Sequence, residues 1–594
     1  MPIEKSVLIQ RCTQPQKIRR DRSGCRSCRK RGKKCDEAKP ICRACIRLGL
    51  ECSYGVDLAF RNYGGDSFTQ GDPTRQPGRA TLRRGLCTST PICTSIESEE
   101  TLETRYLDHF ISHVRHLLPV SPSHFTHQQR TLQSPQLRSA ALCISASNLS
   151  MLSTQVQRRC IPGDSRRSVS SPLVNQLHHA QARKFHEQTL SHCRGVTGLD
   201  MESQAPAILA ALTILAYYHH ASTDHRRFRL AVWDTVRFVS NHREALARSA
   251  DGNEALQMWY RLCVSHRLGK PPALLLEGEG SSVHGPNLYP GSFEELYLHC
   301  IMGLSLDDLI YDILIKTVEI RSRIMVFRCV AGRYGLSDEA REIGGVAHEL
   351  LTRYLGREDN EAEFAETKSG YMRGSHLRGL LHVQRERLAV WKSHLSVSKG
   401  PSPAPDSPVP TRIRTHRDAM NALYSLLCEM MFDEAEAETI VDAPADAPVS
   451  PFHSYAEKFI HILSTLDLAA SITSDVYTFS LTEALLQLVL IYKSQSLFTY
   501  VLDTFWPLLE TKGRGYEHSH YPTQLVKRII GLIAAYWEQG RDIKLVLPSV
   551  REDVPKMELL DICSDVGVVV CGWDGQGVRK GKGRRCFLER TRLP

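Results

Sequence analysis

Six cysteines near the N-terminus constrain the fold of this chain more than any other feature of its sequence. Their spacing is Cys-x2-Cys-x6-Cys-x6-Cys-x2-Cys-x6-Cys, and they stand at Cys25, Cys28, Cys35, Cys42, Cys45 and Cys52. The last three repeat the first three at a constant shift of 17 residues, from Cys25 to Cys42. A segment this short cannot bury a sufficient hydrophobic core, so its folding free energy must come from bound metal. The spacing therefore predicts a small module that is stabilised by metal.

The number of sulfurs sets the number of metal ions. Structural zinc takes four ligands in a tetrahedron, so two zinc ions need eight bonds. Six sulfurs supply eight bonds only when two of them bridge both ions. The internal repeat makes Cys25 and Cys42 the natural bridges, and the other cysteines of each half would hold one ion. We predict zinc as the cofactor, two ions per chain, with all six cysteines as ligands.

Two alternatives to the two-zinc site stay open. A single zinc could be held by Cys25, Cys28, Cys42 and Cys45, although this leaves Cys35 and Cys52 at matching positions without a role. A knot of disulfides would imply a secreted protein. The N-terminal sequence MPIEKSVLIQRC lacks the apolar core of a signal peptide, which disfavours the disulfides.

Positive charge gathers around the first half of the cysteine repeat. The chain has a net charge of +10, and the segment from Lys17 to Arg47 holds thirteen basic and three acidic residues, which equals that excess. Such a field favours a polyanionic partner. The second half of the repeat has mainly apolar residues where the first half is basic, at Ile46, Leu48 and Leu50. We predict that the basic half contacts nucleic acid and that the apolar half packs.

Within the basic half, we predict that some side chains contact bases and others contact phosphates. Arg31 is the candidate for base contact, because a guanidinium matches the O6 and N7 acceptors of guanine. The remaining basic residues are predicted to hold phosphates, and they are Arg29, Lys30, Lys33 and Lys34.

The segment GCRSCRKRGKKCDEAKPICRACIRLGLECSYG resembles the fungal binuclear zinc-cluster DNA-binding domain. The resemblance covers residues 20–55. It implies two short helices around two zinc ions bridged by the first and fourth cysteines, with the first helix in the major groove of DNA. It also implies a ligand role for all six cysteines. Gly32 departs from the family pattern, which usually has a basic residue there.

The rest of the chain is dominated by helical periodicity. Residues 56–98 are rich in glycine and proline and predict a disordered linker, without the heptads of a coiled-coil zipper. Residues 99–550 predict a large helical domain with a disordered Pro/Ser-rich loop near 398–412. Residues 551–594 predict a basic, disordered tail, and only the run 566–570 is typical of a strand. The predicted fold class is all-α.

The helical body resembles the fungal-specific transcription factor domain. The resemblance lies in TRYLDHFISHVRHLLPV, in AILAALTILAYYHHAS and in the helix around Trp233. It implies a regulatory domain that senses signals or contacts other proteins.

Two further patterns in the body have alternative interpretations. The segment from Phe432 to Pro451 interleaves acidic and apolar residues, which is typical of activation segments but also of acidic solvated loops. His109, His113 and His116 share a helical face, where they could hold a metal or lie at the surface.

The chain contains no Gly-rich phosphate loop, Gly-x-Ser-x-Gly elbow or His-Glu-x-x-His motif, so we predict that it is not an enzyme.

The sequence thus predicts a nuclear, sequence-specific transcription factor that regulates RNA polymerase II transcription, of a metabolic or secondary-metabolite gene set. The predicted partners are double-stranded DNA and coactivator or corepressor proteins, without a membrane. A homodimer is compatible with the sequence, although no zipper is present. The alternative is a helical metabolite-binding or enzymatic protein with an accessory zinc module. RNA is a weaker alternative to DNA, because no aromatic stacking platform accompanies the basic residues.

Overall fold

The computed structural model divides the chain into two compact units, Met1–Thr94 and Ser95–Pro594. Part of each unit is described. The described residues are 27–28, 31, 35–36, 38, 42–50, 52, 99–118, 133–151, 156–161, 164–172, 175–196, 200–221, 225–265, 300–355, 373–398, 413, 415–437, 451–468, 474–512, 523–548, 562–563, 567–574 and 585–593. The predicted linker, 56–98, lies outside the described residues.

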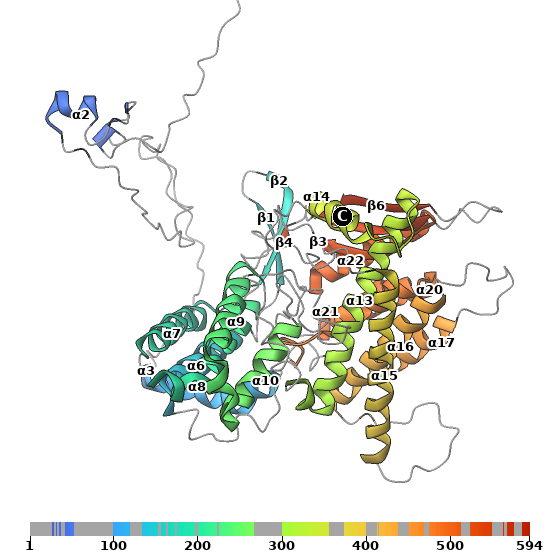
Figure 1. Cartoon of the computed structure of the whole chain (residues 1–594), viewed down its shortest axis with the longest axis horizontal. Helices are drawn as coiled ribbons and strands as arrows, with labels where there is room; N and C mark the ends of the chain where they lie inside the picture. The colour runs from blue at the N-terminus through green and yellow to red at the C-terminus, as the bar shows by residue number, and fades with distance from the viewer. Residues whose placement is uncertain are drawn as a thin grey trace, which may run out of the picture. The chain divides into compact units, whose positions relative to one another are not determined.

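The first unit contains a short helix, α2(Arg43–Leu48) (Figure 1). Cys42 caps its N-terminus, and Gly49 ends it with a φ of 58°, a left-handed conformation that glycine adopts without a Cβ penalty. Ser27 and Cys28 are also helical, and the Arg31 N–H donates to the Ser27 carbonyl at 3.3 Å. The remainder of the predicted first helix lies outside the described residues.

Helices make up most of the second unit, which confirms the helical character that the periodicity predicts. The α-helices are α3(Glu99–His109), α4(Arg115–Leu117), α6(Pro135–Met151), α7(Gln176–Gly195), α8(Asp200–Ala221), α9(His225–Ala247), α10(Ala250–Ser265), α13(Leu306–Tyr334), α14(Ile343–Leu355), α15(Gly374–Ser398), α16(His416–Ala437), α17(Pro451–Ser464), α19(Leu481–Ile491), α20(Gln495–Thr499), α21(Trp506–Lys512) and α22(Thr523–Glu538). Two π-helical segments, η2(Phe110–Val114) and η6(Tyr500–Phe505), continue α3 into α4 and α20 into α21. None of the described helices has the length and apolar character needed to span a bilayer.

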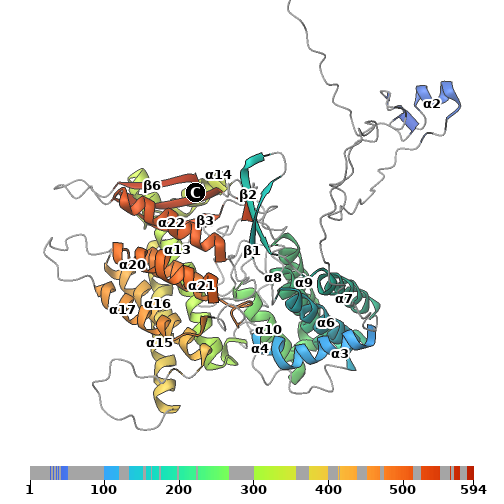
Figure 2. The same cartoon turned by 180° about the vertical axis from the view of Figure 1, so that it is seen from behind.

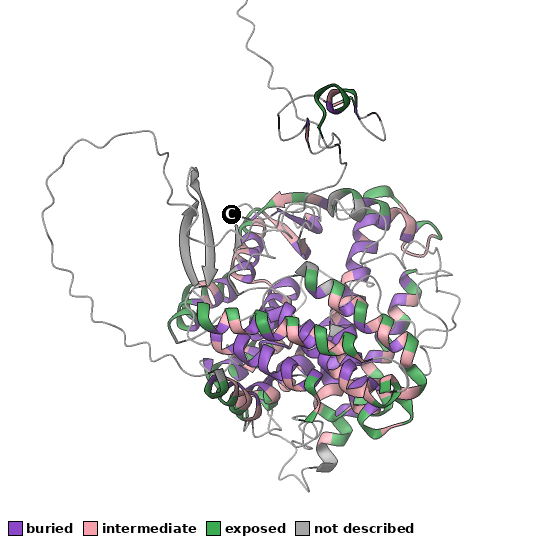
Figure 3. Ribbon diagram, turned by 90° about the vertical axis from the view of Figure 1, so that its left-hand side faces the viewer, coloured by how far each residue is buried: buried purple, intermediate pink, exposed green. Residues whose placement is uncertain are grey.

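The helix α13 runs through the core of the second unit. Ser305 caps its start by accepting from the Asp308 N–H, and Gly335 ends it with a φ of 65°. Its side chains are buried on most sides because α10, α14, α15, α16 and a β-sheet all contact it. Figure 3 shows the buried residues gathered between the helices of this unit. A second group of helices, α3, α6, α7 and α8, packs together around a smaller apolar cluster (Figure 2).

The fold is mostly helical, but it is not all-α as predicted, because the second unit also contains two antiparallel sheets. One has the strand order β1-β2-β4 and the other β3-β5-β6. The strands are β1(Val156–Ile161), β2(Asp164–Pro172), β3(Arg541–Pro548), β4(Ile562–Cys563), β5(Gly567–Asp574) and β6(Cys586–Arg592). The central strand β5 is buried along most of its length, so it lacks the polar alternation by which half-buried strands are recognised.

The prediction of a disordered C-terminal tail is also wrong for the residues that the structure describes. Strands β5 and β6 lie within the predicted tail, and Val568, Val570 and Leu588 are fully or almost fully buried. The helix α22 passes into β3 through Gly540, whose φ is 74°. The basic residues suggested a solvated tail, but the exposed Arg590 and Arg592 alternate with the half-buried Glu589 and Thr591 along β6.

The acidic segment 432–451 does not begin as a loop. The helix α16 extends to Ala437, and Glu434 on it is buried. Its carboxylate accepts from Arg321 Nε at 2.6 Å and from Lys544 Nζ at 2.9 Å. Glu434 is therefore part of the core and is not available to a coactivator, whereas residues 438–450 lie outside the described residues. The predicted loop near 398–412 follows the end of α15 at Ser398, and residues 399–412 also lie outside them.

Candidate metal centre and nucleic-acid interface

Five of the six predicted cysteine ligands are described, and their sulfurs form two groups of three. Cys28, Cys35 and Cys42 make one group, and Cys42, Cys45 and Cys52 make the other. Within each group the sulfurs lie within 4.8 Å of one another. Cys42 belongs to both groups, which is the position that a bridging ligand requires.

The sulfur spacing fits zinc. With zinc–sulfur bonds of about 2.3 Å, two sulfurs on one tetrahedral ion lie roughly 3.8 Å apart. The sulfurs of Cys28 and Cys42 are 3.7 Å apart. A disulfide would bring them to about 2.05 Å, and none of the five described cysteines of the repeat forms a disulfide. The geometry therefore favours metal over the disulfide alternative.

The local backbone of α2 places the second group. Because Cys42 is the N-cap, its sulfur accepts from the Cys45 N–H at 3.4 Å. The turn at Gly49 lets the Leu50 N–H donate to the Cys45 carbonyl at 3.0 Å, which reverses the chain. Cys52 then returns to the group, where its sulfur accepts from the Cys42 N–H at 3.4 Å. Such N–H···S bonds orient the ligands and stabilise thiolates.

One contact joins the two halves of the repeat through a residue that sequence reasoning did not single out. The Arg43 N–H at the start of α2 donates to the Asp36 carboxylate at 3.1 Å. The sequence does contain a signal for this contact. Asp36 directly follows Cys35, and a carboxylate is favoured near a helix N-terminus.

Cys25 lies outside the described residues, so the second predicted bridge has no position here. Each group of three sulfurs needs a fourth ligand to complete a tetrahedron. The single-zinc alternative gives no role to Cys35 or Cys52, yet both of their sulfurs lie within the groups.

Of the five basic residues predicted to contact DNA, one is described in the structure. Arg31 is exposed and directly follows the helical turn that carries Cys28. The other predicted DNA-contacting residues lie outside the described residues, and they are Arg29, Lys30, Lys33 and Lys34. In the second half of the repeat, Arg43 and Arg47 on α2 are also exposed.

The prediction that the apolar half packs is wrong among the described residues of the first unit. Ile46, Leu48 and Leu50 keep 64%, 43% and 38% of their surface exposed. The interior of this unit is made by sulfur instead, since Cys42 and Cys45 are almost fully buried. A module of this size has too few side chains to enclose both the cysteines and an apolar cluster.

The three histidines that share a helical face do not form a metal site. Nε2 of His109 hydrogen-bonds to Oδ1 of Asn148 at 2.9 Å. Burial lowers the pKa of His113, and the neighbouring His109 and His116 lower it further. Among the described residues, groups of three or more side chains placed to hold a metal occur only at the cysteines.

Comparison with known proteins agrees with this geometry. Residues 23–58 match the fungal Zn(2)-Cys(6) binuclear cluster domain. The transcriptional regulatory protein pro1 of Neurospora crassa is 59% identical over 44 residues, which are 7% of this chain and 6% of that protein. The transcription activator AMTR1 of Alternaria alternata is 40% identical over 57 residues, which are 10% of this chain and 7% of that protein.

A third relative has the same domain type in its name. The Zn(2)-C6 fungal-type transcription factor afumD of Aspergillus fumigatus is 53% identical over 36 residues, which are 6% of this chain and 10% of that protein. The chain thus covers at most a tenth of the length of these relatives, and no solved structure matches it significantly. At residues 23–58 the chain contains a Zn(2)-Cys(6) binuclear cluster domain, whose cofactor is zinc, two ions per chain.

Proposed function

We propose that this protein is a nuclear, sequence-specific DNA-binding transcription factor that regulates RNA polymerase II transcription. The observation that carries the proposal is the pair of sulfur groups sharing Cys42, inside a segment that matches the binuclear cluster domain. The three relatives named above are a transcriptional regulatory protein, a transcription activator and a transcription factor.

In this proposal all six cysteines of the repeat are the zinc ligands, with Cys25 as the second bridge beside Cys42. Zinc has a structural role: it contributes the folding free energy that a core would otherwise supply, on the order of 10–16 kcal/mol for small zinc domains. The ligands hold the segment from Cys28 to Cys35 in a fixed shape. Its basic side chains can then meet DNA without first losing the conformational freedom of an unfolded chain.

The DNA contacts divide between bases and phosphates. Arg31, which is exposed, supplies the base contact in the major groove. The phosphate contacts come from Arg29, Lys30, Lys33 and Lys34. The charge excess between Lys17 and Arg47 supports a polyanionic partner, because it attracts DNA and accelerates association.

The second unit is proposed to be the regulatory domain of the same protein, of the fungal-specific transcription factor type. Its proposed partners are coactivator or corepressor proteins, and a homodimer is part of the proposal. The proposed targets are a metabolic or secondary-metabolite gene set, and the protein is proposed to have no enzymatic activity.

The test combines zinc content with sequence selection on the purified full-length protein. We expect two zinc ions per chain and enrichment of one DNA motif from a random pool. The logarithm of the association constant should fall with the logarithm of the salt concentration, with a slope of about −0.9 per phosphate contacted. Cys35→Ala should abolish selection, whereas Cys193→Ala in α7 should leave it unchanged. One zinc per chain, or no enriched motif, would overturn the proposal.

A further inference from the structure

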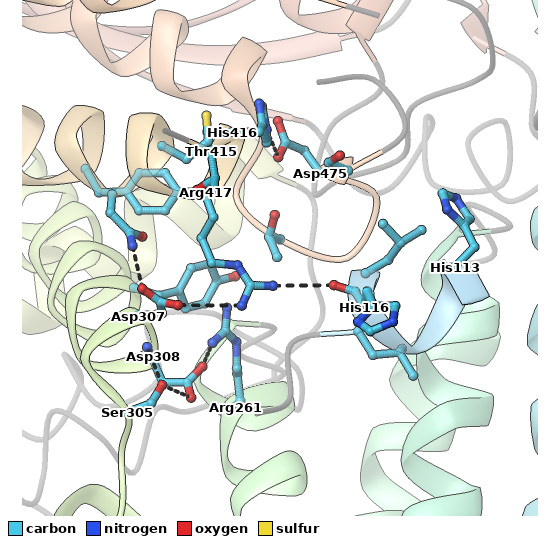
Figure 4. Close-up of a pocket in the computed structure, with 18 of the residues that line it drawn as sticks. His113, His116, Arg261, Ser305, Asp307, Asp308, Thr415, His416, Arg417 and Asp475 are labelled. Atoms are coloured by element: carbon cyan, nitrogen blue, oxygen red, sulfur yellow. Dashed lines mark hydrogen bonds and ion pairs between the residues drawn. The ribbon is translucent and has the colours of Figure 1, made fainter. Parts of the chain in front are cut away.

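The second unit contains a cavity of about 500 Å³ that the proposed function does not use. This volume lies within the range of small-molecule sites, about 300–1,000 Å³. Five parts of the unit line it: the η2–α4 segment, α10, the start of α13, the start of α16 and residues 474–478. Figure 4 shows Arg417 reaching into it from α16 and Arg261 from α10.

Arg417 is weakly held for an arginine beside carboxylate and carbonyl groups. It lies 3.5 Å from Asp307 and donates to the His116 carbonyl at 3.4 Å (Figure 4). Charge-assisted N–H···O bonds are usually about 2.7–2.9 Å long. Half of the Arg417 side chain is exposed. Both contacts are long, so the guanidinium can also donate to a stronger acceptor in the cavity.

The carboxylates of the cavity are engaged by other groups. Asp308 forms an ion pair with Arg261. Asp475 accepts from Nε2 of His416 at 2.8 Å. Oδ1 of Asp307 accepts from Asn421 at 2.7 Å, which leaves its other oxygen to the long contact with Arg417.

Two helices begin at this cavity, and both favour negative charge there. The N-terminus of α13 follows Ser305, and that of α16 follows Thr415, whose hydroxyl accepts from the Asp418 N–H at 3.1 Å. A helix N-terminus carries about half a positive charge. Together with Arg417, the two helix starts make the polar side of the cavity attractive to an anion.

Histidines and apolar side chains complete the lining. His113 and His116 line the cavity, and Nε2 of the exposed His116 accepts from Nε of Arg115 at 3.2 Å. Leu117, Leu118 and Met420 give the same cavity an apolar wall. The cavity therefore offers hydrogen-bonding groups for an anionic head and a hydrophobic surface for an apolar body.

We propose that this cavity binds a small organic anion, whose charged group is held by Arg417 beside the starts of α13 and α16. The apolar body of the ligand lies against Leu117, Leu118 and Met420. This site is built entirely from the second unit, so it does not depend on the zinc cluster or on DNA binding.

The test uses two fluorescent probes that differ by one charge. The first is 8-anilinonaphthalene-1-sulfonate, an aromatic anion, and the second is N-phenyl-1-naphthylamine, the same ring system without the sulfonate. Both are titrated into the full-length, zinc-loaded protein. We expect saturable binding of one equivalent of the anionic probe. Arg417→Gln should weaken that binding roughly tenfold, the loss of one charge-assisted hydrogen bond, and leave the neutral probe within about twofold.

Three further variants distinguish the effect of losing the Arg417 charge from the effect of a damaged fold. Arg417→Lys keeps the charge and should retain most of the affinity for the anionic probe. Ser112→Trp, from an exposed position on the lining, should block both probes. Arg248→Gln, at an exposed position directly after the end of α9, should change neither. Equal loss of both probes in Arg417→Gln, no effect of Arg417→Gln or Ser112→Trp, or no saturable binding by the unaltered protein would each overturn the proposal. Circular dichroism and thermal unfolding verify that each variant is folded.

Discussion

At the scale of single residues, Cys42 is the one described cysteine that is placed to bind both metal ions. Its sulfur belongs to both sulfur groups, whereas Cys35 belongs to one. We predict that Cys42→Ala reduces zinc content to below one ion per chain, because both ions lose a ligand. Cys193→Ala should retain two. Elemental analysis of dialysed protein measures the difference, and two bound zinc ions in Cys42→Ala would contradict a shared ligand.

Arg31 and Lys33 are predicted to act differently on DNA. Arg31→Ala should change the preferred sequence at one position, because a bidentate contact to a base discriminates by about 1–3 kcal/mol. Lys33→Ala should weaken binding to all sequences alike and reduce the salt slope by about one. Quantitative binding to a library of point-substituted sites measures both effects. Arg47→Ala, on the exposed surface of α2, is the control. If Arg31→Ala leaves the preference unchanged, it is not the base-reading residue.

How far the sequence predicts a residue's place depends on the range of the interaction. The cysteine spacing is local chemistry, and it predicted which sulfurs gather and that Cys42 is common to both groups. Glu434 illustrates the opposite case. Its partners Arg321 and Lys544 are more than a hundred positions away along the chain, so the acidic composition around Glu434 suggested a solvated segment.

At the scale of elements, Glu434 connects α13, α16 and β3. Burial acts to raise the pKa of Glu434, but the charges and hydrogen bonds of Arg321 and Lys544 outweigh it and lower the pKa to about 2. Removing one partner of a buried ion pair costs about 3–5 kcal/mol. We predict a loss of that size in Glu434→Gln, measured by urea unfolding of the full chain. Glu436→Gln, two residues along α16 and exposed, should change stability by less than about 1 kcal/mol. Equal effects of the two variants would show that burial of the charge is unimportant.

The same group predicts a pH dependence. The pKa of Glu434 is lower in the folded protein than the ordinary value of 4.5. A carboxyl with a depressed folded pKa contributes stability above its unfolded pKa, and that contribution is lost as the pH falls from 4.5 towards 2. The free energy of unfolding should therefore decrease as the pH is lowered across this window. The fall should be shallower in Glu434→Gln, and identical slopes for the variant and the unaltered protein would contradict the assignment.

Elements were predicted best where their periodicity is amphipathic. Apolar residues recur every four positions at Tyr106, Phe110 and Val114 before Pro119, which is typical of an amphipathic helix, and the α3–η2–α4 segment ends at Leu117. The run 566–570 is typical of a strand, and the central strand β5 begins there at Gly567, whereas β3 and β6 were not predicted. The close approach of β5 to β3, where a Cβ on Gly572 would lie 2.0 Å from the Asp542 carbonyl oxygen, is a tertiary contact that no local pattern reveals.

At the scale of the whole molecule, the two units have different sources of stability. Among the described residues, the buried cluster of the first unit consists of cysteines, whereas the second unit has a large apolar core. We predict that removal of zinc with a chelator abolishes DNA binding by the full chain and leaves its helical circular dichroism almost unchanged. The thermal transition of the second unit should keep its midpoint, and returning zinc should restore DNA binding. DNA binding that persists in metal-free protein, or loss of the helical signal, would contradict this separation.

The buried charges of the second unit also bear on how this sequence can change over time. Full replacement of a buried ion cluster by well-packed apolar residues is often neutral or stabilising, but each intermediate leaves an unpaired charge in the core. Arg321, Glu434 and Lys544 come from three elements, so no single local mutation can replace them together. Among sequences descended from a common ancestor with this one, we expect the three positions to be exchanged as a set or to stay fixed.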